Sequence, residues 1–339
     1  MTRFRGLARN VKGRLKHLLQ TRPPAPLILM YHRIAEAKVD PWRLAVSPNL
    51  FDEQLALLKK RRIVLPLVEF ELLHRGGRLP AKAVAITFDD GYACNALAAA
   101  PLLAKHGASA TIFLATGWIS SPKEFWWDAL ERIISASSVE RLELSLQSET
   151  IAIELGKPDQ HRDARIWDAT AEPRNARQAA YLDLWTRLRL AGDEQRRRAM
   201  TSLHQQAGVS EIARQSHRIM TAAEVRQTAA SGLVEIGAHG VTHPVLSGLG
   251  REEQSSEIRL SRDACRDLVS HSPRAFAYPF GDYDDDTLAA TADAGFQIAC
   301  TTKACCIGRH TESLQMPRLQ VNGWNARELV GAMRNLDRA

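Results

Sequence analysis

The chain has 339 residues, of which 45% are hydrophobic and 24% charged, as is ordinary for a globular protein with a substantial core. Its 45 basic residues outnumber the 38 acidic ones and give a net charge of +7, but much of the excess lies at the extreme N-terminus, so no nucleic-acid partner is predicted. The number of cysteines is odd and no two have Cys-x-x-Cys spacing, which argues against a disulfide framework and for reduced thiols in the cytoplasm. The cysteines are Cys94, Cys265, Cys300, Cys305 and Cys306.

Basic and apolar residues are interleaved with helical spacing over residues 1–22, which predicts a basic amphipathic helix that the prolines from Pro23 onward end. Such a helix can lie on an anionic membrane surface or pack on the body of the protein, and the sequence favours neither. There is no uninterrupted apolar segment typical of a secretory signal and no stretch of about 18 apolar residues for a spanning helix. We therefore expect a cytoplasmic protein, either free or peripheral on the inner face of the membrane.

Strands and helices alternate at the start of the second predicted unit, residues 23–339. Strands are expected at 26–31, 63–68, 84–88 and 108–115, and helices at 51–60, 70–74 and 96–106. This alternation is typical of a parallel sheet with helical crossovers, in which ligand sites lie at the C-terminal ends of the strands.

Two adjacent carboxylates, Asp89 and Asp90, end the apolar strand at 84–88. Neighbouring side chains on a strand point to opposite faces, so both carboxylates can reach one centre only if the backbone turns, as Gly91 permits. Carboxylates this close repel each other, and a nearby cation relieves the repulsion. One of them could then bind a metal while the other moves protons. His32 ends the first strand in the same way, with structural and catalytic roles equally open.

The alternation stops at about 118–230, which predicts an insert beside the barrel that could line a substrate groove. A helix is expected around Trp126 and Trp127, a β-hairpin at 142–155 and a charged helical stretch at 175–206. The two tryptophans could stack on sugar rings, but packing inside the insert is the stronger expectation.

Alternation resumes with strands at 233–238, 274–278 and 296–301 and helices at 252–269 and 285–294.

His239 and His243 follow the first of these strands, and Gly240 and Pro244 argue against a helix there. Together with one carboxylate, the two histidines would form a site for zinc or another divalent ion. Two other groups suggest metal binding less strongly. The acidic run at 282–286 reads as the cap and first turn of the next helix, and the cysteines at 300–306 as ordinary core residues.

Three motifs in this order resemble the polysaccharide deacetylases of carbohydrate esterase family 4, the NodB homology domain: Thr87 to Gly91, His239-x-x-x-His243, and Phe276 to Gly281. The opening segment 27–32, ending in Tyr-His, resembles the bacterial branch that includes poly-N-acetylglucosamine deacetylases. The resemblance covers residues 25–120 and 230–325. It implies an α/β fold, a distorted (β/α)-barrel of about seven parallel strands, which here would carry a mainly helical insert.

The resemblance also implies roles for individual residues. Asp89 would be the general base, and His32 the general acid. The backbone N–H of Phe280 would help to bind the oxyanion. The remaining three residues, Asp90, His239 and His243, would hold a divalent metal, most simply Zn²⁺.

Two features depart from the family pattern. Ala277 replaces the arginine that usually orients the base, which leaves Arg33, Arg274 and Arg318 as unranked substitutes. The late Leu-x-His acid motif is missing, and Met316 to Leu319 stands near its expected place.

The predicted function is metal-dependent hydrolysis that removes N-acetyl groups from a polysaccharide or oligosaccharide containing amino sugars. One alternative is a deacetylase or deformylase of a lipid-linked sugar at the membrane surface, which the basic N-terminal segment favours slightly. The other is a sugar-binding barrel without catalysis, against which the joint presence of Asp89 and Asp90 argues.

Overall fold

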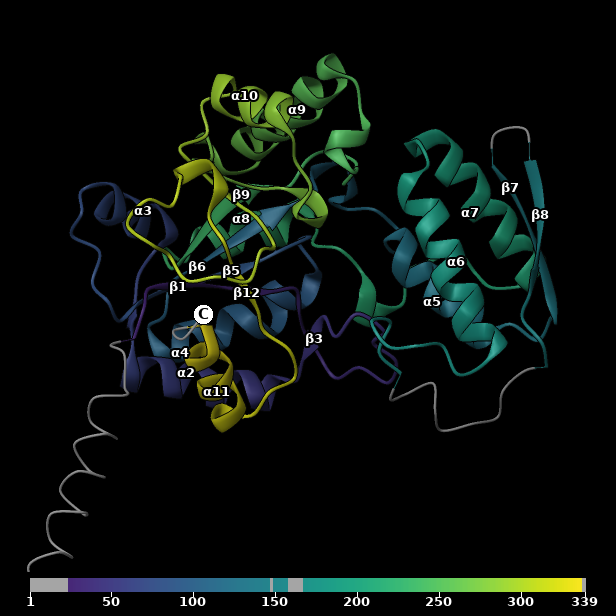
Figure 1. Ribbon diagram of the computed structural model, residues 1–339, viewed down its shortest axis with the longest axis horizontal. Helices are drawn as coiled ribbons and strands as arrows, with labels where there is room; N and C mark the ends of the chain where they lie inside the picture. Colours follow the sequence, from purple (N-terminus) through teal and green to yellow (C-terminus); the bar gives the residue numbers. More distant parts are fainter. Residues whose placement is uncertain (1–23, 147–148, 158–166, 337–339) are drawn as a thin grey trace, which may run out of the picture.

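The computed structural model describes residues 24–146, 149–157 and 167–336 (Figure 1). The helix predicted for residues 1–22 lies outside the described residues. None of the described helices combines the length and apolar composition needed to cross a bilayer.

The described residues contain a main sheet whose strand pairs are all parallel. Seven strands follow one another in the order β11-β10-β9-β6-β5-β1-β12, and β4 pairs with β5 beside them. Their bounds are β1 Leu27–Tyr31, β4 Ile63–Val64, β5 Ala83–Phe88, β6 Ala110–Leu114, β9 Val234–Ala238, β10 Ala275–Ala277, β11 Ile298–Cys300 and β12 Leu319–Gln320. Met316, just before β12, forms a parallel bridge with Cys300 of β11, so the two ends of the sheet curl toward each other. The predicted distorted (β/α)-barrel is confirmed.

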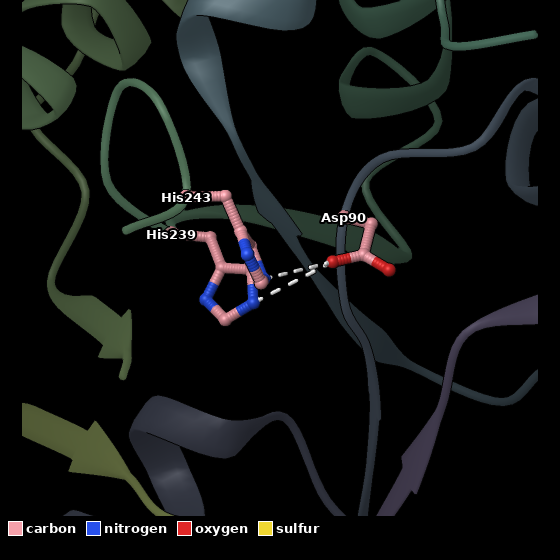
Figure 2. A group of neighbouring side chains, drawn as sticks. All are labelled: Asp90, His239 and His243. Carbon is pink, nitrogen blue, oxygen red and sulfur yellow. Dashed lines mark ion pairs between the residues drawn. The ribbon is translucent and has the colours of Figure 1, made fainter. Parts of the chain in front are cut away.

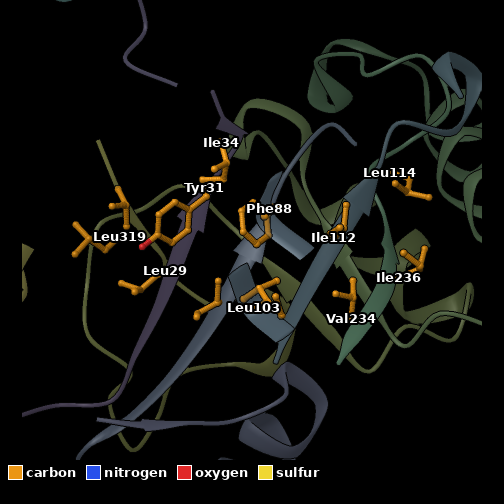
Figure 3. Close-up of a cluster of buried hydrophobic side chains, with 14 of the residues drawn as sticks. Leu29, Tyr31, Ile34, Phe88, Leu103, Ile112, Leu114, Val234, Ile236 and Leu319 are labelled. Atoms are coloured by element: carbon orange, nitrogen blue, oxygen red, sulfur yellow. The ribbon is translucent and has the colours of Figure 1, made fainter. Parts of the chain in front are cut away.

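Side chains alternate between two faces of this sheet. Val84, Ile86 and Phe88 of β5 belong to the large cluster that packs against the surrounding helices (Figure 3). Ala83 and Ala85 belong to a second cluster inside the curl of the sheet. The same alternation directs Asp89, the next residue after Phe88, toward the interior.

Helices pack around the sheet (Figure 1). They are α2 Pro48–Arg61, α3 Leu67–Arg75, α4 Ala100–His106, α8 Ala222–Ala229, α9 Arg251–Val269, α10 Asp285–Asp293 and α11 Ala326–Leu336. The strand predicted at 63–68 is wrong beyond Val64, because Pro66 takes the position before the first turn of α3 and the chain becomes helical from Leu67.

Most of the segment between β6 and α8 forms a body beside the barrel with its own apolar cluster (Figure 1). It contains α5 Trp126–Ala136, the antiparallel hairpin of β7 Arg141–Leu146 and β8 Glu149–Glu154, α6 Ala176–Leu190 and α7 Asp193–Ala207. The hairpin is as predicted. The stretch predicted as helical at 175–206 consists of two helices, because Ala191 and Gly192 are both extended and reverse the chain.

Candidate active site

The C-terminal ends of β1, β5 and β9 lie at one edge of the sheet. Tyr31 of β1 pairs with Phe88 of β5, so the residues that follow these two strands start level with each other. Leu114 of β6 pairs with Ala238 of β9, which brings the end of β9 to the same edge. The residues that follow these strands, His32, Asp89, Asp90 and His239, therefore meet although they are far apart in sequence.

Asp90, His239 and His243 converge in this edge (Figure 2). The Asp90 Oδ1 atom lies 3.6 Å from Nε2 of His239 and 3.4 Å from Nε2 of His243. These separations are too long for good N–H···O hydrogen bonds. Two ligand atoms that each lie about 2.0–2.1 Å from a tetrahedral zinc ion are roughly 3.3 Å apart. The observed spacing therefore fits ligands of a shared cation better than atoms that hydrogen-bond to each other.

Both histidines are in the protonation state that a metal ligand needs. Burial lowers the pKa of His239 to about 4 and that of His243 to about 3, so both rings are neutral near pH 7. Nδ1 of His239 lies 2.6 Å from the carbonyl oxygen of Ala277, and this contact fixes the proton on Nδ1 and leaves the Nε2 lone pair free for a cation. Burial raises the pKa of Asp90, and a cation at this point would favour its charged form.

The backbone is unusual at three residues of this edge. Asp90, His243 and Phe280 have φ values of +74°, +60° and +58°, in the left-handed region that residues other than glycine seldom adopt. Such conformations cost about 1–3 kcal/mol each and tend to cluster at functional sites. The turn after β5 also needs Gly91, since a Cβ there would lie 2.8 Å from a methyl carbon of Leu114.

Arg318, just before β12, makes a two-pronged ion pair with Asp89. Its Nη1 and Nη2 atoms each lie 2.7 Å from one carboxylate oxygen of Asp89. Its Nε donates to the carbonyl of Thr301, and Nη1 also donates to Thr87. Burial raises the pKa of Asp89, but Arg318 with the nearby histidines outweighs it and holds that pKa at about 2. Asp89 is therefore ionised at any ordinary pH and fixed in orientation.

The other two arginines that could have replaced the missing family arginine lie elsewhere. Arg33 is buried, stacks over Tyr92 and donates to the carbonyl of Ser216. Arg274 precedes β10, at the opposite end of the strand from the site, and is exposed.

A cavity of about 260 Å³ opens beside the three converging side chains. His32 lines it together with Asp89 and Asp90. Burial lowers the pKa of His32, and the two carboxylates offset only part of that shift. The ring of Phe280 stands perpendicular to His243, with centroids 4.6 Å apart. All six residues predicted for the site thus lie at one cavity.

Aromatic side chains form much of the cavity wall. Trp127 of α5 lines the cavity, and its ring centroid lies 4.8 Å from that of His243. Its indole N–H donates to the hydroxyl of Tyr92. Trp126 is buried and does not line the cavity. Trp42 and Trp185 also line the cavity, with ring centroids 4.5 Å apart. The sequence analysis missed these two. Neither lies at a strand end, and Trp185 comes from the insert, so only the fold brings them to the site.

A carboxylate holds the loop that carries the two histidines. Glu257 of α9 accepts hydrogen bonds from the backbone N–H groups of Val241 and Thr242, at 2.7 and 3.0 Å, and from the Thr242 hydroxyl. Gly240 has φ +74°, and a Cβ there would come within 3.2 Å of the Glu257 carboxylate. The loop is therefore fixed from α9.

The other metal candidates of the sequence analysis do not form a metal site in the described residues. Of the three cysteines predicted as core residues, Cys300 is buried in the core, whereas Cys305 is exposed and Cys306 is half-buried. Asp284 caps α10 by accepting from the N–H of Thr287, as predicted for the acidic run. Within the described ranges, only one group of three potential metal ligands lies close together, and it consists of Asp90, His239 and His243. No cysteine belongs to this group.

Comparisons with known proteins agree with this fold. The sequence profile described as polysaccharide deacetylase matches residues 76–140 and 200–299, which include the motifs at Asp89, Asp90, His239 and His243. Over these residues the chain matches the polysaccharide deacetylase family. Members of this family are hydrolases of carbon–nitrogen bonds other than peptide bonds.

Two named proteins match part of the chain at 26% identity. YxkH of Bacillus subtilis, named as a polysaccharide deacetylase, matches over 113 residues, 33% of this chain and 40% of its own length. Chitin deacetylase 1 of Cryptococcus neoformans matches over 108 residues, 32% of this chain and 22% of its own length. The matched region therefore spans less than half of either relative.

Solved structures share the fold over nearly the whole chain. The deacetylase PplD of Streptococcus pyogenes, in complex with acetate, aligns with a TM-score of 0.56 and 20% identity over 92% of this chain and 99% of its own. IcaB of Ammonifex degensii aligns with a TM-score of 0.58 and 16% identity over 93% and 98%. At these identities the alignments show the common fold.

Proposed function

We propose that this protein is a metal-dependent hydrolase that removes N-acetyl groups from amino sugars in a polysaccharide or oligosaccharide. The observation that carries the proposal is the placement of Asp90, His239 and His243 at the spacing of cation ligands, next to a charged carboxylate held by Arg318. Two imidazole nitrogens and one carboxylate suit zinc, with positions left for substrate and water. The match to the polysaccharide deacetylase family supports the same reaction.

The metal and Asp89 would divide the first half of the reaction. A divalent ion at the three ligands would supply Lewis-acid chemistry, polarising the acyl carbonyl and making water more acidic. Asp89 takes the proton of the attacking water. With a pKa near 2, Asp89 is a weak base, so it depends on the increased acidity of that water. Arg318 keeps the carboxylate in one orientation throughout.

The second half needs a proton on the leaving amine. Without that proton the carbon–nitrogen bond does not break readily. His32 lines the same cavity as Asp89, and we assign it as the proton donor, while the backbone N–H of Phe280 stabilises the oxyanion. The products are acetate and a sugar with a free amine.

The cavity suits a carbohydrate. Ligand sites of drug-sized molecules span roughly 300–1,000 Å³, so a cavity of about 260 Å³ holds little more than one sugar unit with its acyl group. Trp42 and Trp185, which are both partly exposed, offer apolar surface for a sugar ring. Trp127 lines the same wall but is buried, with Phe125 stacked on it.

The experiment measures release of acetate and formate from N-acetylated and N-formylated glucosamine and its oligomers. Release is measured for the protein as prepared, after removal of metal by chelation, and after Zn²⁺ is added back. We expect acetate release that requires metal and that falls by about 10²- to 10⁴-fold in Asp89→Asn, the usual contribution of a general base. The Asp89→Asn protein should keep its metal. Release that is indifferent to metal and to this substitution would contradict the proposal.

A further inference from the structure

Arg189, near the end of α6, is a half-buried arginine on the wall of the active-site cavity. Its guanidinium lies 4.8 Å from the ring centroid of Phe280 and 5.3 Å from that of Trp185. Because the Phe280 ring itself packs on His243, Arg189 is separated from a predicted metal ligand by a single ring. Its position is therefore set by aromatic contacts beside the reacting centre.

No carboxylate neutralises Arg189 among the residues that the structure describes, where it has neither a salt bridge nor a hydrogen bond, and its Nε atom is buried without a partner. Other arginines of α6 and α7 are paired with carboxylates. Arg187 binds Asp183 on the same helix, and Arg196 and Arg197 both bind Asp193. A partly buried guanidinium without an anion is unfavourable unless something else supplies one.

Arg189 also faces a second cavity, of about 400 Å³, between α6, α7 and α9. Its lining combines apolar residues, among them Leu190 and Leu260 with exposed fractions of 71% and 46%, with the carboxylates of Asp193, Glu253 and Glu257. Asp193 is paired with Arg196 and Arg197, and Glu257 accepts from the loop after β9, so neither of these two is paired with Arg189. Arg189 thus lines both the active-site cavity and this second space.

Resting on the proposed function, we propose that Arg189 is the binding site for an oxyanion, a phosphate or a carboxylate, attached to the amino sugar that carries the acyl group. The planar guanidinium offers paired N–H groups that match both anions, and the aromatic rings on which it stacks limit its freedom. Arg189 is in this view a residue of substrate specificity and takes no part in proton transfer. The acceptable substrates are anionic amino sugars, either free or linked through their phosphate to an apolar chain.

Binding of the deacetylated products tests this without any turnover. Isothermal titration calorimetry on the zinc-loaded full chain compares glucosamine, glucosamine 1-phosphate, muramic acid, and the decyl phosphodiester of glucosamine 1-phosphate. We expect at least one anionic ligand to bind about 10- to 100-fold more tightly than glucosamine, the range for a hydrogen bond to a charged group. The phosphate and the carboxylate arms identify the anion. Tighter binding of the decyl ester than of the free phosphate identifies a substrate linked to an apolar chain.

Variants assign that preference to Arg189. Arg189→Gln should abolish the preference while leaving glucosamine binding within about twofold, whereas Arg187→Gln, on the same helix and exposed, should keep it. Arg189→Lys should retain part of the preference, because it keeps the charge but loses the planar fork. Circular dichroism checks that each variant is folded, and if Arg189→Gln does not fold, the Arg189→Lys comparison decides.

Equal binding of all four ligands by the unmodified protein, or an undiminished preference in Arg189→Gln, would overturn the anion site. These outcomes are separate from a failure of the proposed function, which would appear as no acetate release from any acetylated sugar. If the protein released acetate but showed no preference for anionic ligands, only the proposed anion site would be contradicted.

Discussion

At the scale of single residues, the ion pair of Asp89 and Arg318 answers how the base is held when Ala277 replaces the usual arginine. Arg318 arrives from β12, on the far side of β1 from β5, and approaches Asp89 through the interior of the barrel. Removal of one partner of a buried pair leaves an uncompensated charge, which typically costs about 3–5 kcal/mol. Truncating Arg318 would therefore confuse lost catalysis with lost stability.

A conservative replacement avoids that confusion. Arg318→Lys keeps a positive charge but cannot bind both oxygens of Asp89, so the carboxylate becomes free to turn. Because misplacement of a catalytic group by about 1 Å can cost about 10²-fold, we expect kcat for acetate release to fall by about that factor with metal content unchanged. A weaker interaction with Arg318 also lets burial raise the pKa of Asp89, so the acid limb of the pH–rate profile should move to higher pH. Arg274→Lys is the matched control, and a profile that stays in place in Arg318→Lys would count against the positioning role.

His32 gives a second test at this scale, since its role concerns only the leaving group. An amide nitrogen must be protonated to leave, whereas the phenolate of an activated ester leaves without a proton. His32→Ala should therefore retain metal and lose about 10²-fold or more in acetamide hydrolysis, with a much smaller loss on 4-nitrophenyl acetate. Equal losses on both substrates would return His32 to a structural role, and neither His271 nor His310, the two candidates that the sequence left open, lines the cavity.

At the scale of elements, the local sequence was enough to place those site residues that directly follow a strand. Asp89, Asp90 and His239 each follow an apolar run, and the parallel sheet places such ends at one edge. Arg318 could not be chosen over its rivals in advance, because the two-residue strand β12 has no recognisable pattern and its pairing with β1 is a long-range contact. The break between α6 and α7 was missed for a related reason, since Gly192 is the only local signal there.

The loop between β9 and α9 supplies a prediction about an element. Glu257 binds two successive N–H groups of this loop, so it fixes the path of the chain between His239 and His243. Glu257→Gln loses the charge and one acceptor, and it should weaken zinc binding by about 10- to 100-fold, as is usual for groups that support metal ligands.

Competition with a chromophoric chelator measures that affinity. Glu252→Gln, an exposed position on the same helix, should leave it unchanged. If Glu257→Gln bound zinc as tightly as the unmodified protein, the loop would be held by its own backbone and the helix would have no part in the site.

At the scale of the whole molecule, the cavity is built jointly by the barrel and the insert. Asp89, Asp90 and the histidines come from strand ends, whereas Trp127, Trp185 and Arg189 come from α5 and α6. The insert packs onto the barrel loop through Trp42, whose indole N–H donates to the hydroxyl of Tyr181. Composition and periodicity predict that an insert exists, but not which of its faces meets the site. That face is determined by tertiary packing across a sequence separation of more than a hundred residues.

The same geometry predicts that metal binding stabilises the entire fold. The three ligands follow β5 and β9, which are separated by β6 in the sheet, so an ion would join elements that separate on unfolding. A ligand that binds only the folded state at 100 times its Kd adds about 2.7 kcal/mol to the free energy of unfolding. At roughly 2–4 °C per kcal/mol, scanning calorimetry should show Tm rising by about 5–10 °C when Zn²⁺ is added to metal-free protein.

The quantity to compare between variants is the increase in Tm on addition of Zn²⁺, because replacing a buried histidine also changes the Tm of the metal-free protein. In His239→Ala the zinc-dependent rise should shrink to about 1 °C or less, while His271→Ala, which replaces an exposed histidine, should keep all of it. A rise of the same size in His239→Ala would mean that zinc acts at other groups.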